Sequence, residues 1–267
     1  MSPIDIIHSF VEKFLDGDIS LLASFQLGNL RNNHTYGCPN RKFDSDDTEL
    51  MRAIYCVVYG DTWENLSMEN LGDGKLRGDT INTYNTLFSP PWAERFTSIW
   101  NPDKELLIKI NKFQNIVYTM GNMTILPDRR IGEWSINKHR GCHDSWHDYE
   151  DRFLAALYKV LMGHIDCDPD LKELIQLNYE YFVPFYGENG WHRFIDKNML
   201  EYYVDKNYIP VITSKGYTYW RGGYTNRERF FAECNRYIEF STYIINDRAK
   251  RMIELIRKEL SKIGYSE

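Results

Sequence analysis

The stretch from Thr225 to Lys262 contains neither proline nor glycine, and it constrains the fold more than any other part of the sequence. Thr225 and Glu228 have the spacing of a capping box, which marks the start of a helix. Apolar residues then recur along one face. We expect one long helix here, or two helices broken near Asn246 and Asp247, that closes the fold. The apolar residues are Phe230, Phe231, Cys234, Tyr237, Ile238, Ile244, Ile245, Met252, Ile253, Ile256 and Leu260.

Helix signals also occur along the rest of the chain. Ser2 and Pro3 supply an N-cap and a proline at the first helical position, so a short amphipathic helix should follow. Asp46 and Glu49 have capping-box spacing and predict a second helix that runs through Val58. Four more segments carry a helical apolar pattern or a capping residue: Asn101 to Val117, Trp146 to Met162, Asp168 to Phe182, and Trp191 to Val204.

Extended structure is expected in small amounts. A weak period of two favours a strand or extended loop from Thr80 to Phe88. The segments "IPVITS" and "YTYWRGG" are expected to pair as a hairpin. The fold class we predict is mainly α (α+β), with a helical bundle-like core, a small extended or hairpin element and a long C-terminal helix. The chain divides into residues 1–165 and 166–267, or it forms a single domain.

Charge and hydropathy narrow the choice of partners. The formal net charge is -6 and the pI is about 5.7, whereas broad binding to nucleic acid depends on clustered Lys and Arg. The sequence has no run of about 18 apolar residues, which argues against a membrane span. It has no basic-then-apolar leader either. The five cysteines contain no Cys-x-x-Cys pair, so we expect reduced thiols and a cytoplasmic protein.

Two aromatic stretches are candidates for a contact surface: "NYEYFVPFYGENGWHRF" and "YTYWRGGYTNRERFF". Tyr and Trp anchor protein interfaces, and they also stack on nucleic-acid bases next to Arg. Because the net charge is negative, we favour protein contact or core packing over nucleic acid. The candidate binding residues are Trp191, Tyr217, Tyr219, Trp220, Arg221, Arg227 and Arg229.

The densest group of reactive side chains lies in "NKHRGCHDSWHDYEDR". His139, His143 and His147 are spaced at i, i+4 and i+8, so they would share one face of a helix and could bind a divalent metal. Gly141 weakens a helix at this point, and the zinc-protease pattern of His, Glu and His is absent. The alternative interpretation is a surface turn that leads into a helix.

The run "MGNMTILP" interrupts an apolar segment with Gly121 and Asn122. One interpretation is purely structural. Gly121 would then end the preceding helix as a left-handed C-cap, since glycine adopts positive φ without steric cost. Met123 and Ile125 would enter the core, and Pro127 would end the segment.

The same run resembles the Leu-Gly-Asn-Leu-Thr-Leu-Leu signature of the HNH-type nuclease domain of some modification-dependent restriction enzymes. The matching residues are Gly121, Asn122 and Thr124, and Asn137 resembles the Asn that follows in that family. The family uses a histidine, usually in His-x-x-Pro, upstream of the signature, but no histidine lies between His34 and His139 here. The resemblance therefore implies a degenerate metal-dependent nuclease or nucleotide-acting enzyme, with Asn122, His139, His143 and Asp144 in its site.

A broader resemblance rests on the order of "GDTINTYNTLF", "YTMGNMTILP", then an Asn and "RG" before "DYEDRFLAALY". This order is similar to that in a family of uncharacterised bacterial and phage proteins with a Gly-Asn-x-x-x-Leu-Pro motif. Their occurrence beside mobile elements implies a part in phage and bacterial conflict. The leading hypothesis is thus a non-enzymatic protein without a cofactor that binds another protein, as a phage-encoded inhibitor of a host defence complex, and that self-assembles into a homo-oligomer.

Overall fold

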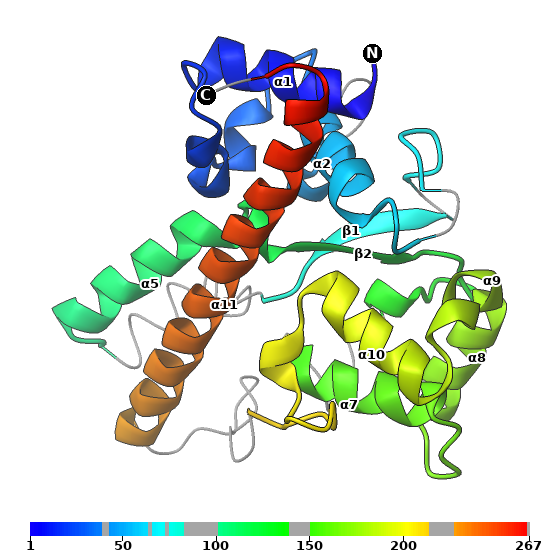
Figure 1. Cartoon of the computed structure of the whole chain (residues 1–267). Helices are drawn as coiled ribbons and strands as arrows, with labels where there is room; N and C mark the ends of the chain where they lie inside the picture. The colour runs from blue at the N-terminus through cyan, green and yellow to red at the C-terminus, as the bar shows by residue number, and fades with distance from the viewer. Residues whose placement is uncertain are drawn as a thin grey trace.

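The computed structural model describes residues 1–38, 43–63, 66–72, 75–82, 101–138, 150–213 and 227–265. These residues form a mainly α-helical fold with a two-stranded antiparallel sheet and a long C-terminal helix, as predicted (Figure 1). The α-helices are α1 (Pro3–Phe14), α2 (Glu49–Tyr59), α5 (Lys104–Val117), α7 (Glu150–Leu161), α8 (Pro169–Leu177), α9 (Tyr179–Phe182), α10 (Gly187–Asn198) and α11 (Arg227–Lys262). Short 3₁₀ turns are η1 (Ile19–Ser24), η2 (Leu27–Leu30), η3 (Ser45–Asp47), η4 (Met120–Asn122), η5 (Val183–Phe185) and η6 (Glu201–Tyr203).

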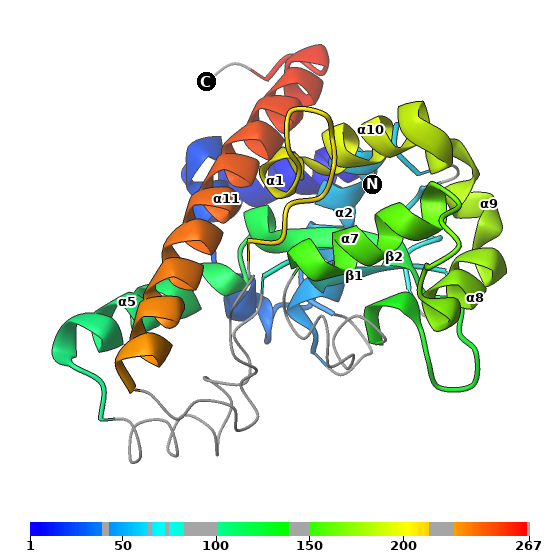
Figure 2. The same cartoon turned by 90° about the horizontal axis from the view of Figure 1, so that it is seen from below.

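Helix α11 is one continuous helix of 36 residues, so the expected alternative of a break near Asn246 and Asp247 is wrong. It runs diagonally across the molecule, with α5 beside its N-terminal half and α1 near its C-terminal end (Figures 1 and 2). The contact between α5 and α11 has its own apolar cluster, which excludes water from the pair. Its buried members are Leu106, Ile110, Phe113, Val117, Cys234, Tyr237, Ile238 and Ile245.

A buried arginine ties α11 to the centre of the fold. The side chain of Arg248 is fully buried. Its guanidinium donates hydrogen bonds to the carbonyl oxygens of Gly121, Met123 and Asn198 and to the hydroxyl of Tyr59. Among the described residues no carboxylate pairs with it. Hydrogen bonds to neutral acceptors therefore offset the free energy lost when this charge is removed from water. One side chain thereby connects α11 with η4, α2 and the end of α10.

The sheet lies at the centre of the molecule and pairs two distant segments (Figure 1). Strand β1 (Leu76–Thr80) is antiparallel to β2 (Met123–Pro127), with Leu76 opposite Pro127 and Thr80 opposite Met123. Every residue of β2 is buried, which confirms that Met123 and Ile125 enter the core and that Pro127 ends the segment. The strand expected from Thr80 to Phe88 begins earlier in the structure, and residues 83–88 lie outside the described part.

Several helix bounds differ from those predicted. Helix α5 starts at Lys104 after the cap Asp103, whereas Asn101 was expected to open it. Helix α10 runs from Gly187 to Asn198, whereas a helix from Trp191 to Val204 was expected.

Ser2 caps α1 in a capping box with Asp5. Helix α2, however, is capped by Thr48 and not by Asp46, because Ser45–Asp47 form the separate turn η3 in front of it, with Asp44 as its cap. The helix expected from Asp168 to Phe182 is divided at Asn178, whose side-chain amide donates to the Leu174 carbonyl. A side chain that bonds the backbone in this way competes with continuation of the helix.

The main apolar core includes residues on both sides of residue 165, from Ile7 in α1 to Leu260 in α11. It does not mark a boundary there, and the two-region division stays a prediction. Of the expected hairpin, residues 209–213 contain no strand, and Pro210 forms an isolated bridge with Val204 instead. The second hairpin segment lies outside the described residues. No helix among the described residues is long and apolar enough to cross a membrane.

Candidate functional site

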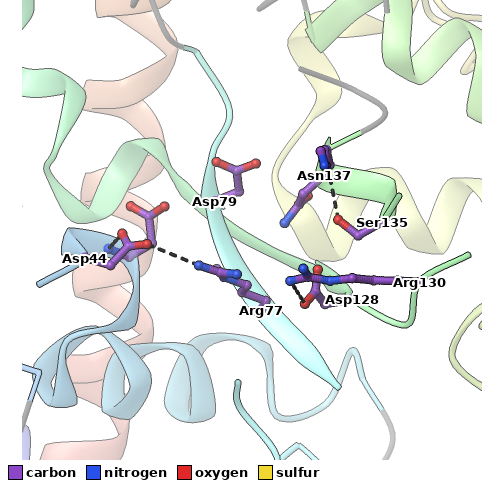
Figure 3. Close-up of a pocket in the computed structure, with 10 residues that line it drawn as sticks. Asp44, Arg77, Asp79, Asp128, Arg130, Ser135 and Asn137 are labelled. Atoms are coloured by element: carbon purple, nitrogen blue, oxygen red, sulfur yellow. Dashed lines mark hydrogen bonds and ion pairs between the residues drawn. The ribbon is translucent and has the colours of Figure 1, made fainter. Parts of the chain in front are cut away.

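A charged pocket of about 290 Å³ opens beside β1 (Figure 3). Four separate segments of the chain form it. Figure 3 shows Asp44 on one side of the strand and Asp128, Arg130, Ser135 and Asn137 on the other, with Arg77 and Asp79 on the strand between them. The described lining residues are Asp44, Asp46, Arg77, Gly78, Asp79, Asp128, Arg130, Ser135, Asn137 and Lys138.

Strand β1 forms the floor of the pocket. Because side chains alternate along a strand, Arg77 and Asp79 share one face and Gly78 faces the other way. A Cβ atom at Gly78 would overlap the hydroxyl of Tyr55 and would lie 2.8 Å from the Asp46 carbonyl oxygen. Only glycine therefore lets β1 pack this closely on α2 and η3.

The acidic wall comes from η3. The Oδ1 atom of Asp44 accepts a hydrogen bond from the Asp46 backbone N–H at 3.2 Å, which caps the turn. The other carboxylate oxygen of Asp44 lies 3.3 Å from Nη2 of Arg77. The pair fixes the turn against the strand, so that Asp44, the cap of η3, and Asp46 within η3 both line the pocket.

The opposite wall begins directly after β2. The side chain of Asp128 is buried, and its Oδ2 accepts a hydrogen bond from Nη2 of Arg130 at 2.8 Å. Between these two residues, the backbone of Arg129 is held by Asn178, which accepts from its N–H and donates to its carbonyl, both at 3.3 Å. The start of α9 thus positions the segment that carries Asp128 and Arg130.

A tight turn and a short helical segment complete this wall. Ile131 and Trp134 exchange two backbone hydrogen bonds, and the Ser135 hydroxyl accepts from the Lys138 N–H at 3.2 Å. Ser135 thereby caps the turn that carries Asn137 into the pocket. The Oδ1 atom of Asn137 is buried and has no hydrogen-bond partner within the described part of the chain.

The carboxylates create a negative field at the floor of the pocket. Burial, followed by the charges of Asp46, Asp79 and Asp44, raises the pKa of Tyr55 well above its usual value. The pKa of Tyr118 is raised as well, by burial first and then by the same three carboxylates. Both phenols therefore stay protonated through the physiological pH range. They lie close enough to these carboxylates that the negative charges disfavour the phenolate form.

A second exposed feature lies on α8, α9 and η5, on the side of the molecule away from α11 (Figure 1). Four large apolar side chains within ten residues are exposed there, among them Tyr179 at 54%. The rings of Tyr179 and Tyr186 lie 5.8 Å apart. We call this feature the tyrosine surface, and it consists of Leu177, Tyr179, Val183 and Tyr186.

The tyrosine surface and the charged pocket are connected through the segment after β2. The guanidinium of Arg129 pairs with Glu180 of α9 at 2.6 Å and lies 6.0 Å from the centroid of the Tyr181 ring. One short segment therefore contacts both features: Arg129 contacts α9, and its neighbours Asp128 and Arg130 line the pocket.

Residues 64–252 match the model of a family described as a family of unknown function (DUF6994). The chain belongs to this family. No curated protein and no solved structure matches it. The match includes the pocket residues from Arg77 to Lys138, whereas Asp44 and Asp46 come before it.

The Gly-Asn-x-x-x-Leu-Pro run, residues 121–127, has a structural role here. Asn122 is fully buried, and its Oδ1 accepts from the Asn82 N–H at 2.9 Å. Its Nδ2 donates to the carbonyls of Asn82 and Val117. It therefore joins the end of α5 to the residues that follow β1.

The expectation that Gly121 forms a left-handed C-cap is wrong. Gly121 has a negative φ and lies in η4, and Tyr118 is the C-cap of α5. A Cβ at Gly121 would overlap the Ile245 carbonyl and would lie 2.9 Å from the Ala249 backbone nitrogen. Glycine is required because α11 crosses the backbone at close range.

The candidate metal ligands His139, His143 and His147 lie outside the described residues, as does Asp144. Within the described ranges no group of three or more His, Cys, Asp or Glu is arranged to hold a metal ion. The metal-dependent alternative stays a prediction. Of its proposed site, the structure describes only Asn122, whose side chain contacts backbone.

The predicted binding residues differ in exposure, and the structure describes only some of them. Trp191 is 1% exposed, and its Nε1 donates to the Tyr208 carbonyl at 2.7 Å, so its assignment to a contact surface is wrong. It belongs to the apolar face of α10, and the spacing of Phe194 and Ile195 was the signal for this. Arg227 and Arg229 are exposed at the start of α11. Tyr217, Tyr219, Trp220 and Arg221 lie outside the described residues.

Proposed function

We propose that this protein is a non-enzymatic binding protein that contacts a partner protein through the tyrosine surface. The observation that carries the proposal is the exposure of Leu177, Tyr179, Val183 and Tyr186 within one short stretch. Contiguous apolar side chains on a surface mark contact sites, whereas single ones need no explanation. Tyrosine provides a large contact area at a small entropic cost and is frequent among the residues that dominate binding energy.

The charge around this surface favours a protein partner over nucleic acid. Glu180 neutralises Arg129 at its edge, and the chain carries a net charge of -6. Binding to phosphates requires clustered basic residues, which supply most of the affinity for nucleic acid. An interface built from tyrosine and aliphatic side chains with one ion pair at the rim resembles a protein contact.

The biological role we propose is inhibition of a bacterial defence complex by a phage-encoded protein. It is supported by the motif order that resembles proteins found beside mobile elements. Self-assembly into a homo-oligomer through the tyrosine surface belongs to the same proposal, because the exposed apolar side chains of two copies would cover one another. No cofactor takes part in this role.

The proposal is tested by capture of partners from a bacterial host lysate with the unaltered protein and with Tyr179→Ser/Tyr186→Ser. The expected result is a defined partner that is retained by the first and lost by the second. Ile165→Ser is the matched control, because Ile165 is fully exposed on the α7–α8 loop outside the tyrosine surface. Equal capture by the double variant and the control would refute the role of the tyrosine surface.

A further inference from the structure

We propose that the tyrosine surface of one copy docks on the outer face of α11 of a second copy, so that the protein assembles head to tail. The inference rests on the proposed self-assembly through the tyrosine surface, and it names the surface that the second copy presents. We call this second surface the basic face, and it consists of Arg251, Leu255, Lys258 and Lys262.

The basic face lies on the C-terminal third of α11. Its residues follow one another at i, i+4, i+7 and i+11, a spacing that places side chains on one side of a helix. Leu255 is 37% exposed, and both lysines are exposed beside it. The face therefore presents an apolar side chain to solvent among cations.

The charge of this part of α11 is positive. Residues 250–262 carry five basic and two acidic side chains, namely Lys250, Arg251, Arg257, Lys258 and Lys262 against Glu254 and Glu259. A cation in the last turn stabilises the helix dipole, and Lys262 has that position. Lys250 and Lys258 lie before the last turn, and within the described residues neither forms an ion pair. The helix dipole therefore does not account for these two charges.

The tyrosine surface has the opposite sign. Residues 170–188 carry four acidic side chains and one basic side chain, namely Asp170, Glu173, Glu180 and Glu188 against Lys172. Glu173 lies one helical turn before Leu177 on α8, and Glu188 lies two residues after Tyr186. Both glutamates are exposed, and within the described ranges neither is in an ion pair. They therefore add negative charge at the edge of the exposed tyrosines.

This charge disfavours a contact between two tyrosine surfaces. In a two-fold dimer the same patch faces itself. Two acidic rims would then lie against each other, and like charges repel more strongly the closer they come. A tyrosine surface that covers the basic face brings opposite charges together instead. Complementary potentials of this kind select the partner and the orientation of a contact.

The apolar parts of the two surfaces also match. Tyr179 is 54% exposed, and Tyr186 is 37% exposed. Their rings can cover Leu255 and the apolar stems of the two lysines, because a lysine side chain places its charge at the end of an aliphatic chain. An ammonium group over a tyrosine ring adds a cation–π attraction. The contact thus removes apolar surface from water on both copies.

The two surfaces lie on different sides of the molecule. Helices α8 and α9 are far from the C-terminal third of α11 in both views (Figures 1 and 2). One copy can therefore use both surfaces at the same time. A contact between unlike surfaces continues from copy to copy and ends in a closed ring or an open chain. We therefore expect assemblies of more than two copies as the protein concentration rises.

The test measures mass by light scattering across a range of protein concentrations. Tyr179→Ser/Tyr186→Ser removes the tyrosine surface, and Leu255→Ser/Lys258→Glu removes the basic face. Each full-length variant is measured alone and in an equimolar mixture with the other, after circular dichroism has verified that it is folded. Lys258→Glu alone takes the place of the second variant if that variant does not fold, since Lys258 is exposed.

The matched control is Ile108→Ser/Lys112→Glu on α5. Ile108 is 44% exposed, and Lys112 is exposed one turn later on the same helix. The control makes the same chemical change on a helix surface outside both proposed surfaces. It should associate as the unaltered protein does.

We expect each surface variant alone to associate at least about tenfold more weakly than the unaltered protein, because it lacks one of the two surfaces. The mixture should form a pair with one copy of each variant, since each supplies the surface that the other lacks. Association of the unaltered protein should weaken as NaCl rises from about 0.05 to about 0.5 M, because salt screens exposed charges.

The inference is overturned if Leu255→Ser/Lys258→Glu self-associates as the unaltered protein does while Tyr179→Ser/Tyr186→Ser does not. That result would assign a two-fold contact between tyrosine surfaces, and the proposed function would stand. It is also overturned if the mixture does not pair, or if the unaltered protein stays a single copy at every concentration. In that last case, a host partner that only Tyr179→Ser/Tyr186→Ser fails to retain would keep the proposed function.

Discussion

Nη2 of Arg248 donates a hydrogen bond to the hydroxyl of Tyr59 at 2.7 Å, and both side chains are fully buried. The bond joins α11 to α2 across 189 residues of sequence. The same guanidinium nitrogen also donates to the Met123 carbonyl at 3.0 Å, where β2 begins. Strand β2, which pairs with the strand at the floor of the charged pocket, is therefore joined to the long helix by a buried cation.

Replacement of Arg248 by methionine should destabilise the protein strongly. Arg248→Met keeps an apolar side chain of similar length but leaves several buried acceptors without a donor, at about 1–3 kcal/mol for each group. We expect the free energy of unfolding in urea to fall by about 3–5 kcal/mol. Arg251→Met is the control, because it breaks the partly exposed pair with Glu201 and should cost at most about 1 kcal/mol. Equal losses for the two variants would contradict the role of Arg248.

A methyl group at Gly121 should loosen the contact between η4 and α11. Gly121→Ala places a Cβ against backbone atoms of Ile245 and Ala249, which cannot rotate away, and overpacking of this kind costs about 1–3 kcal/mol. Gly28→Ala is matched to it, since Gly28 also has a negative φ and its Cβ would meet open space. The melting temperature of each variant measures the effect, and it should fall for Gly121→Ala but not for Gly28→Ala. An unchanged melting temperature for Gly121→Ala would mean that η4 and α11 do not pack as described.

The thiol of Cys56 should react slowly at neutral pH although it is only half-buried. Burial raises its pKa to about 11, despite the opposing charge of Arg52. The reactive thiolate is therefore scarce below that pH and increases as the pH rises through it. Alkylation read by peptide mass spectrometry should be slower at Cys56 than at Cys167 at pH 8 and should accelerate toward pH 11. If Cys56 is labelled as fast as Cys167 at pH 8, its thiol is not desolvated as the structure indicates, and the prediction is wrong.

Metal content separates the proposed binding function from the nuclease alternative. The non-enzymatic proposal predicts that elemental analysis of the purified protein finds no stoichiometric zinc, manganese or nickel. Stoichiometric metal that is lost in His143→Ala would contradict it and would direct assays toward nucleic acids. The variant is informative because His143 has a metal-ligand spacing with both His139 and His147.

The helices could be predicted because their signals are local. Ser2 with Pro3, and Asp168 with Pro169, mark helix starts by residues next to them in the chain. The long C-terminal helix followed from the absence of proline and glycine. The errors also have local causes. Asp44 to Asp47 form a turn that moves the cap of α2 to Thr48, and Asn178 ends α8 by binding the Leu174 carbonyl.

The pocket could not be predicted, because its four segments meet only through the pairing of β1 with β2 and the packing of η3 and α9. The tyrosine surface could have been found from the sequence, because Tyr179, Val183 and Tyr186 lie in an aromatic stretch that we selected, but we chose the buried Trp191 from that stretch instead. The burial of Arg248 could also have been predicted from its position. It lies three residues after Ile245 and four before Met252, so it falls on the apolar face of the helix. Such a position indicates a buried and hydrogen-bonded charge.

The most direct test of protein contact through the tyrosine surface is the mass of the purified protein by light scattering, with and without Tyr179→Ser/Tyr186→Ser. The chain has a mass of 31.8 kDa. The proposal predicts a larger mass for the unaltered protein, from a second copy or a retained partner, and a return to 31.8 kDa in the double variant. A mass of 31.8 kDa for both proteins, or the same larger mass for both, would contradict it.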